Sequence, residues 1–344
     1  MEYKKEVKCV IWDLDNTIWD NVLTESKTIK LKTGIEDILN TLDSRGILNS
    51  ISSKNNYDDA MRKLKEFSID HYFLYPQINW NAKSASVAQI QKDLNIGIDT
   101  IVFIDDQPYE REEVKSQHPQ VECIDSVDYK ELLSRSRFNP KFITKDSQRR
   151  RLMYLENIKR TRLEEEYEGP KDEFLASLNM EFIISEAAEE DLQRAEELTV
   201  RTNQLNATGK TYSYKELNYF RSSPNHKLLV CELKDKYGSY GKIGLGLIHI
   251  TEITWEIKLL LMSCRVISRG VGSVLLSYIM KQAKTENKKV TADFIKTDRN
   301  KMMYVTYKFS NFKEVLVLDN GYIKFENTLE KIQEFPPYIK LSIN

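Results

Sequence analysis

Residues 8–135 alternate short apolar runs with stretches in which apolar residues recur every three or four positions. A short apolar run predicts a buried strand, and the wider spacing predicts an amphipathic helix. The predicted strands are CVIWDLD, ILNSISS, IVFIDD and VECID. The predicted helices are interleaved with them, at residues 34–46, 57–67, 83–94 and 108–117. Strands separated by helices of this length predict a parallel sheet with helices on both faces.

Residues 181–344 show a second alternation, in which strands outnumber helices. Apolar runs predict strands at EFIISEA, HKLLVCEL, KIGLGLIHI, WEIKLLLMSCRV, KVTADF, EVLVL and YIKFE. Helical spacing recurs at residues 189–201, 271–284 and 301–309. This half is therefore predicted to form a second α/β unit.

Between these halves the chain is dense in charge, and we place the domain boundary there. The prediction is a first domain at residues 1–140, a helical connector at 141–180 and a second domain at 181–344. Two interpretations are open for Arg149–Arg151, a phosphate or nucleic-acid patch and a solvated helix face. The second is favoured, because acidic residues follow at once and no aromatic stacking platform accompanies the arginines.

The overall charge is balanced: Lys and Arg number 51, Asp and Glu number 52, and the net charge is −1 over 344 residues. That balance argues against a chain that coats nucleic acid or an anionic membrane. No apolar run approaches the roughly 20 residues of a membrane span. The four cysteines are scattered, without metal-site or disulfide spacing. We therefore expect a reduced, cytoplasmic protein with neither nucleic acid nor membrane as a partner.

Polar side chains follow three of the predicted strands of the first domain, and a lysine opens one of its helices. The carboxyl ends of parallel strands share one edge of the sheet, where ligands bind. Carboxylates there suit Mg²⁺, which binds few protein carboxylates together with a substrate phosphate. One aspartate can then act as nucleophile and another as general acid/base, while the lysine and a serine hydroxyl hold phosphoryl oxygens. The residues concerned are Asp13, Asp15, Ser53, Lys83, Asp105 and Asp106. The alternative is a set of surface carboxylates on an inactive α/β domain.

DLDNT resembles the first motif, DxDxT, of the haloacid dehalogenase superfamily of phosphotransferases. Ser53, Lys83 and the Asp105–Asp106 pair fall where that superfamily places its second, third and fourth motifs. The resemblance implies that Asp13 is the nucleophile and that Asp15 is the acid/base. It also implies that the backbone carbonyl of Asp15 binds Mg²⁺ with Asp13 and Asp105, and that Thr17 steadies the turn. The gaps between these motifs are too short for a large lid domain, so we expect an open site.

In the second domain, SRGVGSVLLSYIM places Gly270 and Gly272 before a predicted helix. Backbone amides at a helix N-terminus can receive an anion. The stretch resembles the pyrophosphate-binding turn of the GCN5-related N-acetyltransferase fold, which implies a mixed sheet. A plain strand–helix turn would explain the glycines as well.

Six stretches in order resemble the FkbH-like family: DLDNTIW, SSKNN, INWNAKS, FIDDQPYERE, RTNQLNATGKTYS and MSCRVISRGVG. Members couple a phosphatase-like domain to an acetyltransferase-like domain and load a glycolytic three-carbon unit onto acyl carrier protein. The resemblance implies 1,3-bisphosphoglycerate as the substrate and a glyceryl thioester on the phosphopantetheine of the carrier as the product. Such units supply polyketide-type biosynthesis.

Cys264 is the candidate for acyl transfer in the second domain. A thiolate attacks an acyl phosphate readily, and the adjacent Arg265 favours the thiolate. We therefore predict that Cys264 carries the glyceryl group before it passes to the carrier thiol; the alternative is an inert strand cysteine. Asn203 and Gln204 are predicted to hydrogen-bond substrate or pantetheine amides, although loop capping is an equal alternative.

Two other functions compete with glyceryl loading. One is a phosphatase fused to an acyl-CoA-dependent acetyltransferase. The other is a non-catalytic module that docks a carrier protein, which the complete set of four motifs disfavours.

Overall fold

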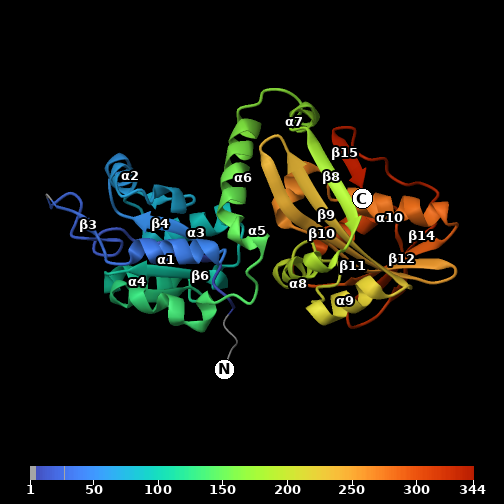
Figure 1. The fold of residues 1–344 in the computed structure, drawn as a ribbon, viewed down its shortest axis with the longest axis horizontal. Helices are drawn as coiled ribbons and strands as arrows, with labels where there is room; N and C mark the ends of the chain where they lie inside the picture. The colour runs from blue at the N-terminus through green and yellow to red at the C-terminus, as the bar shows by residue number, and fades with distance from the viewer. Residues whose placement is uncertain (1–4, 27) are drawn as a thin grey trace. The chain divides into compact units, whose positions relative to one another are not determined.

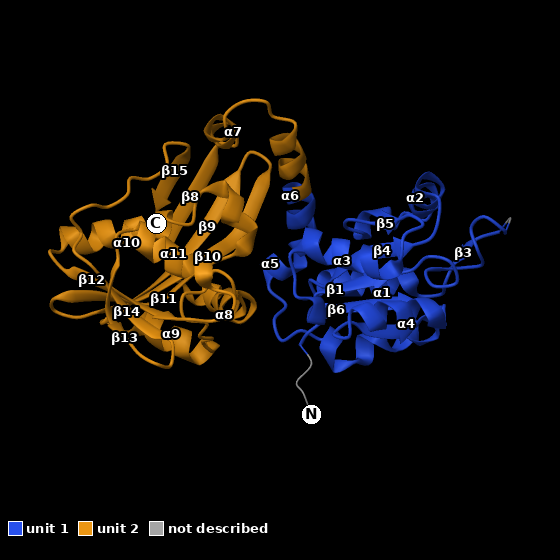
Figure 2. Ribbon diagram, turned by 180° about the vertical axis from the view of Figure 1, so that it is seen from behind, with its two compact units in different colours: residues 1–157 blue, residues 158–344 orange. Residues whose placement is uncertain are grey.

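The computed structural model describes residues 5–26 and 28–344, so residues 1–4 of the predicted first domain and Lys27 lie outside the described part. The chain forms two compact units that divide within helix α6 (Arg150–Glu165). The first unit ends at Asn157 and the second begins at Ile158 (Figure 2). The charged stretch at 141–180 contains three helices, α5 (Lys145–Gln148), α6 and α7 (Lys171–Ser177).

The first unit is built on a five-stranded sheet in the order β5-β4-β1-β6-β7 (Figure 1). Each neighbouring pair in this order is parallel. Its strands are β1 (Cys9–Trp12), β4 (Leu48–Ser53), β5 (Gln77–Ile78), β6 (Ile101–Asp105) and β7 (Glu122–Asp125). All residues of β1, β4 and β6 are buried, as expected for parallel strands that are covered on both faces.

Four longer helices accompany this sheet, and α1 packs against the strand side chains that include Val10 and Trp12. The helices are α1 (Ile35–Ser44), α2 (Tyr57–Glu66), α3 (Lys83–Leu94) and α4 (Pro108–Gln117). Between β1 and β4, the described residues form only α1 and a small two-stranded ribbon. The ribbon consists of β2 (Trp19–Asp20) and β3 (Lys30–Leu31). The unit therefore lacks a large cap, as predicted.

The second unit is built on an eight-stranded mixed sheet in the order β13-β14-β12-β11-β10-β9-β8-β15. The pairs β11–β12 and β8–β15 are parallel, and the other pairs are antiparallel. Its strands are β8 (Met180–Glu186), β9 (His226–Asp235), β10 (Gly238–Ile250), β11 (Thr254–Met262), β12 (Lys289–Ile295), β13 (Lys313–Val317), β14 (Tyr322–Asn327) and β15 (Ile339–Ile343). Its helices are α8 (Leu192–Arg201), α9 (Tyr214–Ser222), α10 (Val274–Thr285) and α11 (Lys301–Phe309).

The predicted fold class is confirmed: a parallel α/β unit without a large cap precedes an α/β unit with a mixed sheet. Details of the second unit differ from the prediction. Helix α9 and strand β15 were not predicted, and α10 begins at Val274 rather than Val271. The predicted strand through SCRV ends at Met262, and a 3₁₀ helix at Cys264–Arg269 follows it. Within the described part of the chain, no helix combines the length and apolar character needed to cross a membrane.

Candidate active site

Lys83 lies at the centre of a carboxylate cluster at the carboxyl edge of the first unit's sheet. It is the first residue of α3 and its side chain is only 2% exposed. Its Nζ donates to Asp13 Oδ1 at 2.6 Å, to Asp105 Oδ2 at 3.0 Å and to the backbone carbonyl of Ser52 at 2.7 Å. A third carboxylate, Glu110 of α4, lies 3.0 Å away through Oε2. Strand ends β1, β4 and β6 thus converge on one ammonium group.

The cluster fits a divalent cation. One ligand oxygen from each of Asp13, Asp105 and Glu110 lies within 4.8 Å of the others. Carboxylate oxygens are hard ligands of the kind that Mg²⁺ prefers. Lys83 contacts all three acids and Lys54 contacts Glu110, so the three carboxylates, when ionised, keep an excess negative charge that a bound cation would neutralise. Asp13 and Asp105 were predicted as ligands from the sequence, and the structure brings them together.

Burial dominates the proton affinities in this cluster. It raises the pKa of Asp13, although Lys83 and a hydrogen bond with Ser53 oppose the rise. Burial, reinforced by the charge of Asp13, raises the pKa of Asp105 to about 8. Burial alone would lower the pKa of Lys83, but the three carboxylates outweigh it and hold that pKa above its ordinary value. The lysine therefore stays charged, and Asp13 and Asp105 take up protons more readily than ordinary aspartates when no cation is bound.

Asp15 is fixed by three donors. Its Oδ1 accepts from the indole Nε1 of Trp19 at 2.8 Å and from the backbone N–H of Leu23 at 3.0 Å. Its Oδ2 accepts from Asn55 Nδ2 at 3.0 Å, and the same amide donates to Ser53 Oγ at 3.2 Å. The carboxylate is thereby oriented and tied to the insertion that follows β1.

The remaining predicted residues of this unit lie close by, with less defined roles. Thr17 is buried in the turn after β1, and its Oγ1 has no hydrogen-bond partner among the described residues. Asp106 is half-buried, and burial raises its pKa. It is not one of the three acids that converge, so its role as a metal ligand stays a prediction.

Two residues of this site were not singled out from the sequence, Glu110 and Asn55. Both stand in the motif stretches FIDDQPYERE and SSKNN. Glu110 lies in the first turn of α4, which begins directly after the end of β6. An acid in the first turn after a predicted catalytic strand is a weak signal for it, because acids are common in the first turn of helices.

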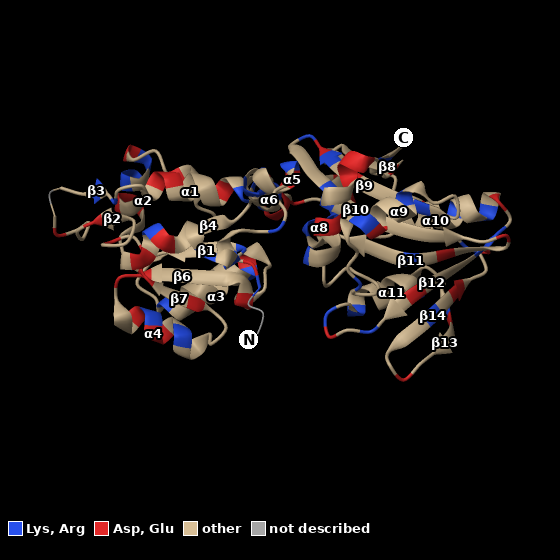
Figure 3. Cartoon of the chain, turned by 60° about the horizontal axis from the view of Figure 1, so that its bottom comes forward, with Lys and Arg blue, Asp and Glu red and all other residues tan. Residues whose placement is uncertain are grey.

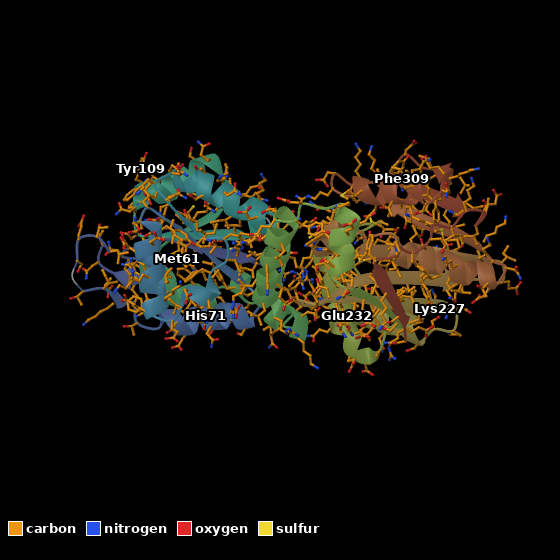
Figure 4. All side chains as sticks on the ribbon, turned by 90° about the horizontal axis from the view of Figure 1, so that it is seen from above. Met61, His71, Tyr109, Lys227, Glu232 and Phe309 are labelled. Carbon is orange, nitrogen blue, oxygen red and sulfur yellow. The ribbon has the colours of Figure 1, made fainter. Side chains whose placement is uncertain are left out.

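Exposed aromatic rings follow three strand ends at the edge of the sheet that carries the cluster. Tyr57 follows β4, Trp80 follows β5 and Tyr109 follows β6, each within four residues of the strand. Trp80 is 73% exposed and Tyr109 is 74% exposed, and Figure 4 labels Tyr109 at the surface. We call Tyr57, Trp80 and Tyr109 the aromatic rim. Its exposure agrees with the open site predicted from the short gaps between motifs.

In the second unit, the loop residues 205–207 pair with the C-terminal part of β11, where β12 no longer pairs with it. The β11–β12 ladder runs only from Thr254 to Ile257 on the β11 side. Further along, the N–H of Ala207 donates to the carbonyl of Leu260 at 3.0 Å, and the N–H of Met262 donates to the carbonyl of Leu205 at 2.9 Å. The N–H of Ile295 in β12 donates to the carbonyl of Ala207 at 3.1 Å. Residues 205–207 therefore bridge the two strands.

A buried asparagine fastens this segment. Asn300 Nδ2 lies 3.1 Å from the carbonyl of Asn206, 3.3 Å from that of Ala207 and 2.9 Å from that of Ile295. Asn206 accepts from the backbone N–H groups of Thr208 and Gly209. The polar loop predicted from RTNQLNATG is thus an ordered part of the sheet.

Asn206 bridges Leu261 in an antiparallel sense near the end of β11. Asn203 and Gln204 come shortly before this bridge along the chain, and Cys264 comes two residues after the end of β11, so their meeting at one site stays a prediction. Asn203 and Gln204 are exposed, and Cys264 is partly exposed as the first residue of the 3₁₀ helix. The Nε of Arg265 donates to Ser263 Oγ at 3.3 Å.

Both predicted glycines lie in the turn before α10. Gly270 has φ +70°, and a Cβ there would collide with the Tyr338 hydroxyl, so both backbone and space require glycine. Gly272 faces open space. The structure therefore explains Gly270 by the turn itself, and anion binding by this turn stays a prediction.

No family model matches the chain, and no curated protein matches it. One similar solved structure is the N-terminal part of the protein BF1531 from Bacteroides fragilis, which is described as containing a phosphatase domain complexed with Mg. It is 31% identical over 38% of this chain, with a TM-score of 0.33. The chain spans only 40% of that structure. The ribosomal-protein-S18-alanine N-acetyltransferase from Escherichia coli is 12% identical over 44% of this chain and 97% of its own length, with a TM-score of 0.35. An N-acetyltransferase from Staphylococcus aureus is 16% identical over 43% of this chain and 99% of its own length, with a TM-score of 0.34.

The strand orders and the carboxylate site of this chain define its class. It is a two-unit α/β protein in which a unit with a parallel sheet and a carboxylate cluster precedes a unit with a mixed sheet.

Proposed function

We propose that the chain is a Mg²⁺-dependent enzyme that dephosphorylates a phosphorylated three-carbon substrate and transfers its acyl group to a carrier thiol. The observation that carries this proposal is the convergence of Asp13, Asp105 and Glu110 on Lys83 at the carboxyl edge of a parallel sheet. Such a cluster has the ligands for Mg²⁺ and the cation for a phosphoryl group in one place.

In the first unit, an oxygen of Asp13 attacks the phosphorus of a phosphate ester. The bond from phosphorus to the leaving oxygen breaks, and that oxygen takes a proton from Asp15, whose orientation Trp19 and Asn55 hold. Water then cleaves the aspartyl phosphate and releases inorganic phosphate. Asp13, Asp105 and Glu110 would hold Mg²⁺, which when bound would supply positive charge against the two anions that meet here. Lys83 keeps the Asp13 oxygen in position.

In the second unit, the Cys264 thiolate attacks the acyl phosphate carbonyl of 1,3-bisphosphoglycerate. A C–S bond forms, the C–O bond to the 1-phosphate breaks, and the acyl group is held as a thioester. It is a glyceryl group once the first unit has removed the 3-phosphate. The phosphopantetheine thiol of acyl carrier protein then displaces Cys264. The partly exposed position of Cys264 just after β11 supports this step, as does the resemblance to the FkbH-like family.

The test is the intact mass of a phosphopantetheinylated carrier protein incubated with this protein, Mg²⁺ and a system that generates 1,3-bisphosphoglycerate. We expect a glyceryl adduct, its loss in Asp13→Asn or Cys264→Ala, and no adduct with acetyl-CoA alone. Unchanged loading by Cys264→Ala would reject the covalent step. No loading by the wild-type protein would reject the proposal as a whole.

The mixed sheet of the second unit favours one alternative, acetyl transfer from an acyl-CoA. Acetylation of an amine by the protein with acetyl-CoA, without any carrier protein, would support that alternative instead.

A further inference from the structure

Lys83, the cation at the centre of the carboxylate cluster, has no N–H group left for a substrate. An ammonium group carries three donors. Asp13 and Asp105 accept from two of them, and the carbonyl of Ser52 accepts from the third. Glu110 lies 3.0 Å away as a fourth partner. Lys83 therefore acts on a phosphoryl group through its charge, and a direct hydrogen bond to that group has to come from another donor.

Lys54 is a second cation in contact with the cluster. Its Nζ lies 2.8 Å from Glu110 Oε1, while Lys83 contacts Oε2 of the same carboxylate, so Glu110 bridges the two lysines. Within residues 5–26 and 28–344, Glu110 is the only acid that pairs with Lys54. The Lys54 side chain is 38% exposed. Its ammonium group therefore has donors to spare, on a side chain that a ligand can reach from solvent.

The chain on either side of Lys54 also contacts the site. Strand β4 ends at Ser53, and a turn leads from it into α2. A hydrogen bond links Ser53 to Asp13, and Asn55 donates to Asp15 Oδ2 at 3.0 Å. Three successive side chains thus contact acids of the candidate active site. A partly exposed ion pair contributes little to stability, so stability alone accounts poorly for a lysine at this position.

The charge on the rest of the first unit does not replace such a contact. Basic and acidic positions are interspersed over its helices and loops, and α4 alone carries both signs (Figure 3). Arg111 of α4 is already engaged, because it donates to the backbone carbonyl of Asp105 at 2.7 Å and to Asp125 Oδ2 at 2.6 Å. A phosphate therefore depends on individual cations at the site and not on a broad positive surface.

We propose that Lys54 binds the substrate directly, by donating a hydrogen bond to an anionic oxygen of the phosphoryl group that Asp13 receives. The inference rests on the proposed function and assigns to Lys54 the contact that Lys83 does not make. Glu110 is also a candidate metal ligand. When Glu110 serves as one, its hold on Lys54 weakens, and more donors of the ammonium group are available to the phosphate.

The test is the binding of inorganic phosphate to the full-length chain in saturating Mg²⁺, measured by calorimetry beside the binding of Mg²⁺ alone. Lys54→Met should weaken phosphate binding about tenfold or more, the loss expected for one charge-assisted hydrogen bond. Mg²⁺ alone should bind this variant at least as tightly as the wild-type protein, because Lys54 no longer competes for Glu110. Lys54→Arg keeps the charge and should retain most of the phosphate binding.

Lys92→Met is the matched control. Lys92 is exposed in the last turn of α3, and the cluster lies at the opposite end of that helix, which begins at Lys83. Removing the same charge there should leave both affinities unchanged. Circular dichroism and Tm confirm that each variant is folded.

The two affinities separate a substrate contact from a structural role. Equal phosphate binding by the wild-type protein and Lys54→Met would overturn the proposal, and so would a wild-type chain that binds no phosphate in saturating Mg²⁺. A parallel loss of Mg²⁺ and phosphate binding would also overturn it, because Lys54 would then only support the metal ligands. Phosphate binding needs no carrier protein, so a failure to load glyceryl groups would reject the proposed acyl transfer and leave the Lys54 contact standing.

Discussion

Replacing Lys83 by Met would test the electrostatics of the carboxylate cluster. The substitution keeps much of the apolar stem and removes the ammonium group that contacts Asp13, Asp105 and Glu110. Removing one partner of a buried ion pair typically costs about 3–5 kcal/mol of unfolding free energy. We expect about 3 kcal/mol, the lower end, because the pKa of Asp105 is already raised and the acids can take up protons.

The assay is urea denaturation in the absence of metal, followed by tryptophan fluorescence and circular dichroism. Lys54→Met is the matched control, because Lys54 Nζ also contacts Glu110, at 2.8 Å, but its side chain is 38% exposed. An exposed pair contributes at most about 1 kcal/mol. Mg²⁺ should restore more stability to Lys83→Met than to the wild-type protein, since the unpaired acids then bind the cation without competition.

A Lys83→Met protein as stable as Lys54→Met would refute this reasoning. It would mean that the acids are solvated or protonated in the folded protein and do not depend on the lysine. Equal stabilisation of both proteins by Mg²⁺ would argue that the cation binds elsewhere.

Three further outcomes are expected. Iodoacetamide should label Cys264 before the other cysteines, as followed by peptide mass spectrometry. The reason is that burial raises the pKa of Cys123 to about 11, and that Cys9 and Cys231 are buried. Earlier labelling of another cysteine would contradict this prediction. Trp80→Ala should raise KM for a carrier-bound or other large substrate several-fold and leave a small phosphate ester unaffected; equal losses would show that the aromatic rim is structural. Without metal, the stability of the first unit should fall as pH rises from about 4 to about 8, because folded Asp105 keeps a proton that the unfolded chain loses near 3.8. The rise in Tm with Mg²⁺ should therefore grow across that range, and a constant rise would contradict the assignment of Asp105.

Strands β1 and β6 of the first unit could be predicted because they are nearly continuous apolar runs, whereas the two-residue strand β5 was not predicted. A strand such as CVIW is buried on both faces, so its pattern depends on no other part of the chain. Strand β15 shows where this fails. Its sequence IKLSI is short and only Ile339 is buried, and it pairs with β8, which lies more than 150 residues earlier. Only that distant pairing makes it a strand.

The residues of the candidate active site also fall into those that the sequence could predict and those that it could not. Asp13, Ser53, Lys83 and Asp105 could be predicted because each stands at or near the end of an element that local pattern identifies. Glu110 could not be assigned from its position alone, since acids are common in the first turn of helices for reasons of helix dipole. Its contact with Lys83 depends on where α4 packs beside α3.

The segment at residues 205–207 changes what the second unit can bind. A pantetheine arm carries amides that could pair with a free strand edge. The C-terminal part of β11 would have such a free edge if no other segment paired with it beyond the end of the β11–β12 ladder. Leu205 and Ala207 already bond the backbone of Leu260 and Met262 there. Under the proposed function, an incoming thiol would therefore reach Cys264 without pairing with this strand edge. That route suits a thiol on a long arm that a carrier protein delivers to the surface.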